Sequence, residues 1–185
     1  MPKQNNLRII PLGGSDEVGM NMILLEYKEK ILIIDMGLGF PDEDMPGIDC
    51  LIPNTNYLKD KVKNIVGAVL THGHYDHIGA IPYLTPRLGT LPMYTGALTK
   101  GLILKRQEDF PNQPRLHIEV VQDGTVVRLS PFTVEFFSQT HSIPDNLGVF
   151  VKTPFGNIIH TSDFKFDQNP VNEPPTNFKR LKELG

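Results

Sequence analysis

Four side chains that can bind a metal ion crowd into one short stretch of this sequence: His72, His74, Asp76 and His77. The chain has six histidines, so half of them fall within six positions. Imidazole and carboxylate groups without a thiolate suit Zn²⁺ or Mn²⁺, and catalytic Zn²⁺ commonly takes three protein ligands and a water. Three surface histidines in a polar turn are the alternative, but the clustering favours a metal site.

The cluster follows an apolar, β-branched run at residues 65–70 that is typical of a buried strand. It therefore lies where a strand ends and a loop begins. On an extended backbone, side chains two positions apart point the same way, so His72 and His74 share one side. The turn after them carries Asp76 and His77 to a second position. The spacing thus predicts two neighbouring metal positions.

Alternating and apolar runs predict further strands. They lie at residues 7–12, 21–27, 31–34, 91–94, 116–121, 125–129, 132–137, 147–153 and 158–161. We expect the first three to form a β-meander and the last two to pair. The dipeptide Asp123-Gly124 predicts a hairpin that joins 116–121 to 125–129.

Helices are expected at residues 54–63, 96–109 and 177–184, the first of them capped by Asn54. Pro82 and Pro86 limit residues 78–88 to a short helix that packs beneath the metal loop. Residues 40–53 are rich in Pro, Gly and Asp and show no sustained period, which indicates a loop.

Several other reactive side chains follow or interrupt predicted strands. Asp35 ends a strand beside glycines, where its carboxylate can point back toward the histidine loop or satisfy turn amides. His141 and Asp163 each follow a strand. His117 and His160 stand within strand-like segments, and we interpret them as packing or surface residues. Cys50, the only cysteine, is interpreted as an ordinary thiol.

In combination, five stretches of the chain resemble the ribonuclease J family, the β-CASP branch of the metallo-β-lactamase superfamily. These stretches are Gly13–Met22, Asp35–Pro41, His72–His77, Thr140–Asp145 and Thr161–Asp167. The HxHxDH pattern alone would indicate only the superfamily. The resemblance implies an α/β (α+β) fold, a metallo-β-lactamase-like αββα sandwich. Residues 1–185 would form only its N-terminal portion, the first lobe, without the β-CASP domain and the second lobe.

The resemblance also implies roles for single residues. The implied metal ligands are His72, His74 and His141 for a first ion, Asp76 and His77 for a second, and Asp163 for both. Asp76 would in addition orient a hydroxide or move a proton, with pure coordination as the alternative. Asp35 would hold the histidine loop in place. The family supplies one more histidine ligand from later in its chain, and none follows His160 here.

The implied activity is hydrolysis of RNA phosphodiesters, as an exonuclease or an endonuclease, with two Zn²⁺ or Mn²⁺ ions that activate a hydroxide. We expect the chain alone to be a weak or inactive ribonuclease. Two alternatives stay open: a small-molecule hydrolase of the thioesterase or lactamase type, which would use the same HxHxDH pattern, and a noncatalytic fragment. Full-length members of the family suggest a homo-oligomer.

Composition sets the remaining expectations. A chain of 185 residues, 39% hydrophobic and 21% charged, indicates one soluble globular domain. No apolar run approaches the roughly 20 residues needed to cross a bilayer. Residues 1–6 lack the apolar core of a signal peptide, so we expect a cytoplasmic protein without a membrane partner. A net charge of −3 gives RNA binding no support, because independent nucleic-acid binders are usually basic.

Overall fold

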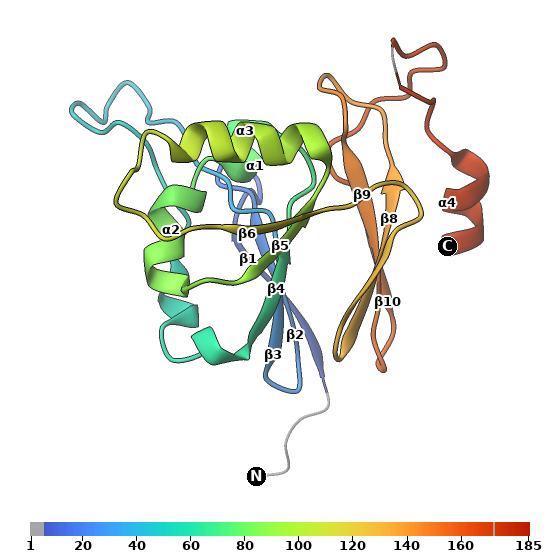
Figure 1. The fold of residues 1–185 in the computed structure, drawn as a ribbon, viewed down its shortest axis with the longest axis horizontal. Coiled ribbons are helices and arrows are strands. Elements are labelled where there is room, and N and C mark those ends of the chain that lie inside the picture. Colours follow the sequence, from blue (N-terminus) through green and yellow to red (C-terminus); the bar gives the residue numbers. More distant parts are fainter. Residues whose placement is uncertain (1–5, 172) are drawn as a thin grey trace.

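A computed structural model describes residues 6–171 and 173–185 of the chain. Residues 1–5, which contribute to the expectation of no signal peptide, lie outside this part. Two β-sheets pack face to face, and helices cover the outer face of the larger sheet (Figure 1). The predicted layered α/β sandwich is confirmed.

The larger sheet has six strands in sequence order. They are β1 (Leu7–Gly13), β2 (Met22–Tyr27), β3 (Lys30–Ile34), β4 (Ile65–Val69), β5 (Pro92–Thr95) and β6 (His117–Val120). The first three are antiparallel, which confirms the meander, whereas β3 to β6 run parallel. The smaller sheet is antiparallel, with the order β10-β9-β8-β7. Its strands are β7 (Val126–Leu129), β8 (Phe132–Ser138), β9 (Leu147–Lys152) and β10 (Asn157–His160).

Helices connect the parallel strands. Among the described residues they are α1 (Tyr75–Ile78), α2 (Ile81–Leu88) and α3 (Ala97–Gln107), while α4 (Phe178–Leu184) lies beside the smaller sheet (Figure 1). Gly37 lets the loop after β3 approach α1 closely, because a Cβ there would lie 1.6 Å from the Asp76 carbonyl oxygen. No helix in the described part of the chain is long and apolar enough to cross a membrane.

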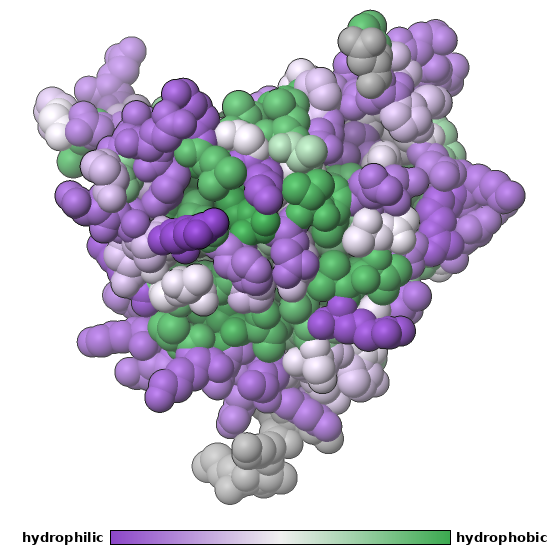
Figure 2. Space-filling model, in the orientation of Figure 1, coloured by the Kyte–Doolittle hydropathy of each residue, from purple (hydrophilic) through white to green (hydrophobic). Residues whose placement is uncertain are grey.

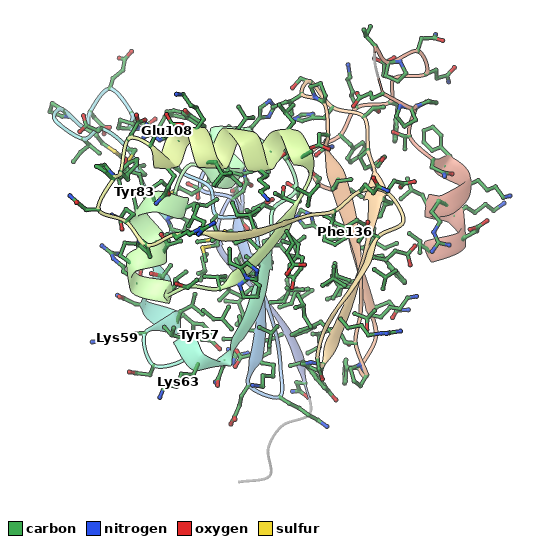
Figure 3. The ribbon with its side chains drawn as sticks, viewed as in Figure 1. Tyr57, Lys59, Lys63, Tyr83, Glu108 and Phe136 are labelled. Carbon is green, nitrogen blue, oxygen red and sulfur yellow. The ribbon has the colours of Figure 1, made fainter. Side chains whose placement is uncertain are left out.

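The central strands bury both of their faces. In β3, Ile31 and Ile33 pack into the core beneath the helices, while Leu32 and Ile34 pack into the core between the sheets. Side chains alternate along a strand, so a strand with two buried faces is a continuous apolar run. Phe136 on β8 fills the core between the sheets from the opposite side (Figure 3). The strand ends are thereby fixed in position.

The predicted hairpin between 116–121 and 125–129 is wrong. β6 pairs with β5 in the larger sheet, and β7 pairs with β8 in the smaller one. The backbone N–H of Val121 still bonds to Thr95 of the larger sheet, whereas that of Gly124 bonds to Phe136 of the smaller sheet. The Asp123-Gly124 turn therefore carries the chain from one sheet to the other.

The structure also differs from the prediction of one helix at residues 54–63. Asn54 does act as a cap, since its side chain accepts a hydrogen bond from the Asn56 N–H over 3.0 Å. After this cap the chain forms two 3₁₀ turns, η1 (Thr55–Leu58) and η2 (Val62–Asn64), in place of one α-helix. Runs of 3₁₀ helix are short because their hydrogen-bond geometry is poorer than that of an α-helix.

Candidate metal centre

Two adjacent parallel strands deliver the first part of the site. Asp35 directly follows β3, and Thr71 and His72 follow β4, so these residues meet at the same edge of the sheet. The Asp35 N–H donates to the Val69 carbonyl over 2.9 Å. Asp35 has a φ of +60°, a conformation that is uncommon for a residue with a side chain and that turns the backbone sharply at the strand end.

The one-turn helix α1 delivers Asp76 and His77. The sequence predicts a turn for these residues, and the structure places them in the first turn of this helix, with His74 as its N-cap. A helix of one turn leaves most of its carbonyls without helical partners, although the Tyr75 carbonyl accepts from the Gly79 N–H over 2.7 Å. The loop after β3 adds further bonds: Leu38 N–H also donates to the Tyr75 carbonyl, and Met36 N–H donates to the His77 carbonyl. These bonds hold the histidine loop in a single position.

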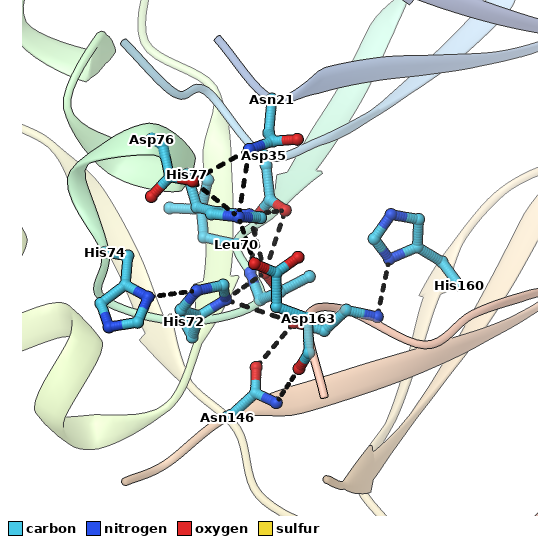
Figure 4. Close-up of polar contacts among 12 residues, drawn as sticks. Asn21, Asp35, Leu70, His72, His74, Asp76, His77, Asn146, His160 and Asp163 are labelled. Atoms are coloured by element: carbon cyan, nitrogen blue, oxygen red, sulfur yellow. Dashed lines mark hydrogen bonds and ion pairs between the residues drawn. The ribbon is translucent and has the colours of Figure 1, made fainter. Parts of the chain in front are cut away.

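The smaller sheet delivers His141 and Asp163. His141 follows β8 and Asp163 follows β10. The N–H of Lys165 donates to the Thr140 carbonyl over 2.8 Å, which joins the two loops. The Leu147 N–H also donates to the Thr71 carbonyl over 3.0 Å, which joins the smaller sheet to the histidine loop. The site therefore straddles the ends of both sheets (Figure 4).

These elements bring together two overlapping groups of donor atoms. The groups are His72, His74 and His141, and His72, His77 and Asp163, with the donor atoms of each group within 4.8 Å of one another. In the first group, His72 Nε2 lies 3.0 Å from His74 Nδ1. In the second, His77 Nε2 lies 3.5 Å from Asp163 Oδ2. Asp76 Oδ2 is also 3.5 Å from His77 Nε2, so its carboxylate borders the second group.

The donor atoms fit a divalent cation. Within residues 6–171 and 173–185, His141 Nε2 is buried without a hydrogen-bond partner, and Asp163 Oδ2 lies 3.9 Å away. A buried polar atom left unsatisfied costs free energy, and a bound ion would satisfy it. The set of imidazole and carboxylate groups without thiolate suits Zn²⁺ or Mn²⁺.

Burial and neighbouring charges shift the pKa values of the histidines in different directions. Burial, together with the positive charge of His77, lowers the pKa of His72 to about 3, so this imidazole stays neutral. Burial also lowers the pKa of His141. Burial alone would lower the pKa of His77, but the Asp35 carboxylate and the hydrogen bonds to Asp163 and Asp35 raise it to about 10. His72 and His141 thus offer neutral lone pairs.

The carboxylates beside His77 are ionised. The hydrogen bond with His77 lowers the pKa of Asp163 to about 2. Burial alone would raise the pKa of Asp35, but the charge of His77 and its hydrogen bond lower it. Two negative groups thus face one histidine, so the second group attracts positive charge before any ion arrives.

Asp35 lies behind the donor atoms. It is 2% exposed, and its carboxylate accepts hydrogen bonds from Thr71 N–H over 2.7 Å, Thr71 Oγ1 over 2.9 Å and His77 Nδ1 over 2.8 Å. His160 belongs to neither donor group, and its Nδ1 accepts a hydrogen bond from the Ser162 N–H over 3.2 Å (Figure 4). His117 lies on β6, 3.8 Å from Glu119, and belongs to neither donor group.

Four polar residues that contact the donors or their neighbours were not predicted from the sequence. The Asn21 amide lies 3.3 Å from Asp76 Oδ2 and 3.1 Å from His77 Nε2. Thr71 and Ser162 place hydroxyls 3.0 and 3.2 Å from His72 Nδ1, and Asn146 contacts Ser162. Asn21 and Ser162 lie inside two of the motif stretches, while Thr71 and Asn146 each directly adjoin one. Their positions in or beside these stretches are the feature of the sequence that could have identified them.

Comparison with known proteins identifies the family. A family profile described as the metallo-beta-lactamase superfamily matches residues 16–178, which include all of the donor residues. The chain belongs to the metallo-β-lactamase superfamily. Two solved structures share the fold of this chain. A protein of unknown function from Enterococcus faecalis V583 covers 86% of this chain and 44% of its own, with a TM-score of 0.71 and 22% identity. The metallo-beta-lactamase fold protein YhfI from Bacillus subtilis covers 87% and 64%, with a TM-score of 0.59 and 16% identity.

Sequence relatives narrow the likeness within the superfamily. Ribonuclease J of Thermus thermophilus is 40% identical over 98% of this chain and 33% of its own length. Ribonuclease J of Corynebacterium glutamicum is 40% identical over 98% of this chain and 25% of its own. Ribonuclease J 1 of Streptococcus pyogenes is 38% identical over 99% and 32%. The resemblance inferred from the motifs is confirmed, and the chain spans a quarter to a third of the length of these relatives.

Proposed function

We propose that this chain is the metal-binding portion of a ribonuclease J-type hydrolase that cleaves RNA phosphodiesters. The observation that carries the proposal is the pair of overlapping donor groups at the ends of the two sheets, with the orphaned Nε2 of His141 among them. The relatives named Ribonuclease J support the substrate class, since they match nearly the whole chain.

The proposed ligands follow from the two groups. His72, His74 and His141 would hold a first divalent ion, Asp76 and His77 a second, and Asp163 would contact both. Zn²⁺ is the first candidate and Mn²⁺ the second. Ions held there would supply an activated hydroxide and stabilise negative charge on the phosphate oxygens.

The protein's own groups would then orient and move protons. The Asn21 amide donates to Asp76 Oδ2, which leaves Oδ1 of this partly exposed carboxylate to accept a proton from an attacking water. Asp35 holds His77 through Nδ1, so Nε2 faces the site. His77, in turn, has Asp163 Oδ2 within 3.5 Å, and half of the Asp163 side chain is exposed to solvent. We propose that Asp76 moves the proton and that Asp35 positions the histidine loop.

Residues 1–185 would form the N-terminal portion of a larger catalytic unit, because the relatives are three to four times longer. The second donor group shares His72 with the first and has only one histidine of its own, His77. We therefore expect the chain alone to cleave RNA weakly or not at all, since positioning of the substrate and charge stabilisation are both incomplete.

The test is cleavage of 5′-monophosphorylated single-stranded RNA with Zn²⁺ or Mn²⁺. Six proteins are compared. They are the 185-residue chain and a chimera in which the downstream part of Thermus thermophilus Ribonuclease J follows Gly185, each as the unsubstituted protein, as His74→Ala and as His117→Ala, a control outside the site. We expect slow or no cleavage by the chain and fast cleavage by the chimera that His74→Ala abolishes and His117→Ala leaves intact. A folded chimera that binds metal and leaves RNA uncut would contradict the assignment.

A further inference from the structure

The side chain of Asn146 joins the two loops that carry His141 and Asp163. It is 2% exposed, and its amide nitrogen donates to the Gln139 carbonyl over 3.2 Å and to the Asp163 carbonyl over 2.7 Å. A backbone carbonyl oxygen accepts hydrogen bonds and cannot donate them. The amide orientation is therefore fixed by its partners: Nδ2 faces the carbonyls, and Oδ1 faces the other way.

That orientation fixes the hydroxyl hydrogen of Ser162. Asn146 Oδ1 can only accept, and Ser162 Oγ lies 2.6 Å from it, so the hydroxyl donates its one hydrogen there. The same Oγ lies 3.2 Å from His72 Nδ1 and has only lone pairs left for it. His72 Nδ1 must then carry the hydrogen of this contact.

The Thr71 hydroxyl oxygen is a second acceptor for the same hydrogen. This hydroxyl donates to Asp35 Oδ2 over 2.9 Å, and its oxygen lies 3.0 Å from His72 Nδ1. Two hydroxyls whose hydrogens are already committed thus face one ring nitrogen. Which nitrogen of a metal-binding histidine is free depends on the hydrogen bond made by the other.

We infer that Ser162 and Asn146 are positioning residues that hold His72 in the tautomer with hydrogen on Nδ1, which leaves Nε2 unprotonated among the donor atoms of the site. Nε2 lies 3.0 Å from His74 Nδ1, on the side where the two donor groups overlap. The consequence for metal affinity rests on the proposed function, whereas the tautomer does not. Asn146 has a second effect, because the same amide sets the spacing of the loops that carry His141 and Asp163.

The backbone conformation of Ser162 offers a substitution that distinguishes the positioning of His72 from a purely structural role. Ser162 has a φ of +59°, a left-handed conformation that favours glycine. Glycine at this position would relieve strain while removing the hydroxyl. If Ser162 served only the turn, glycine would raise the stability of the protein and change nothing else. If Ser162 orients His72, glycine would also disturb the His72 tautomer.

The experiment measures the His72 tautomer by ¹⁵N NMR of the imidazole in the metal-free chain, and Zn²⁺ affinity by competition with a chelator. The variants are Ser162→Gly, Asn146→Ala and a control, Thr153→Ala, whose hydroxyl donates to the Gly156 carbonyl in a remote turn. We expect Ser162→Gly to melt at or above the wild-type temperature. Only the Thr71 oxygen then accepts from His72 Nδ1, so the variant should populate the other His72 tautomer measurably and bind Zn²⁺ about tenfold more weakly.

Asn146→Ala should give the same mixed tautomer, because the freed Ser162 hydroxyl can then donate to His72 Nδ1. Thr153→Ala should match the wild type in both readouts. A His72 that keeps hydrogen on Nδ1 in both site variants would overturn the inference, even if Zn²⁺ affinity falls. A wild-type chain that binds no Zn²⁺ would count against the proposed function. The tautomer measurement would then still decide the inference about Ser162 and Asn146.

Discussion

Asp35 shows how a single buried carboxylate can organise the histidine loop. It accepts hydrogen bonds from the backbone N–H and hydroxyl of Thr71 and from His77 Nδ1. Thr71 lies 36 positions after Asp35 in the chain, and His77 lies 42 positions after it. Each bond fixes one part of the loop relative to β3. A neutral amide of the same shape cannot accept all three, because one of its two polar atoms is a donor.

The Asp35→Asn variant should therefore bind Zn²⁺ about 10- to 100-fold more weakly, the range found when an outer partner of a metal ligand is lost. Chelator competition measures the affinity. Asp123→Asn is the matched control, since the Asp123 carboxylate accepts a hydrogen bond from the Ser138 N–H over 2.8 Å and belongs to neither donor group. Equal affinities for the two variants would show that Asp35 does not act through the ligands.

At this scale the sequence predicts part of the site. Spacing alone singled out the cluster at 72–77, because four donors in six positions rarely serve only solvent. The partners of the cluster are less visible: Ser162 lies 90 positions from His72, and Asn146 lies 16 positions from Ser162. Such contacts depend on how the two sheets pack, and periodicity within one strand carries no information about that.

At the scale of elements, strand periodicity predicted the central sheet well, because strands buried on both faces leave long apolar runs. It failed at Asp123-Gly124, where the turn was found but the partners of the flanking strands were not. Edge strand β6 exposes Val120 and carries His117 and Glu119, and apolar groups remain visible on the face over which β6 runs (Figure 2). The sequence of such a short edge strand does not indicate whether its neighbour in the sheet is parallel or antiparallel.

A charge cluster around the buried Glu26 ties the first two strands to η1. Glu26 of β2 is 6% exposed and accepts hydrogen bonds from Tyr57 and from Lys61 over 3.2 Å, while Arg8 of β1 lies 3.4 Å away (Figure 3 labels Tyr57). Burial alone would raise the pKa of Glu26, but the bonds from Tyr57 and Lys61 and the positive charges lower it. The ionised form is thus favoured in the folded protein.

Glu26→Gln should lower the free energy of unfolding by about 2 kcal/mol at pH 7, the scale of a hydrogen-bonded charge. A depressed pKa contributes stability above the unfolded value of about 4.3, and this is lost as the pH falls through the folded value. Urea unfolding at pH 7 and at about pH 3 should show the difference shrinking. The control is Glu108→Gln, which removes an exposed pair with Lys105 (Figure 3). A difference that stays constant with pH would contradict the charge-based explanation.

At the scale of the whole molecule, net charge opposes the binding of RNA, the proposed substrate. Net charge is −3, and of the cations in the C-terminal helix, Arg180 is paired with Glu135 and Glu183. Affinity for a polyanion depends on cations that neutralise phosphates. The chain alone should bind single-stranded RNA with a Kd weaker than about 10⁻⁵ M at physiological salt, by fluorescence anisotropy. Submicromolar binding would show that local geometry outweighs net charge.

Zn²⁺ titration of the metal-free chain tests most directly whether the two donor groups bind metal ions. The three-histidine group should bind one equivalent tightly, and the second group should bind another more weakly, because it shares His72 and has only His77 as a histidine of its own. His74→Ala should remove the tight equivalent, whereas His117→Ala should leave both unchanged. A chain that binds no Zn²⁺, or binds it equally well without His74, would contradict the claim.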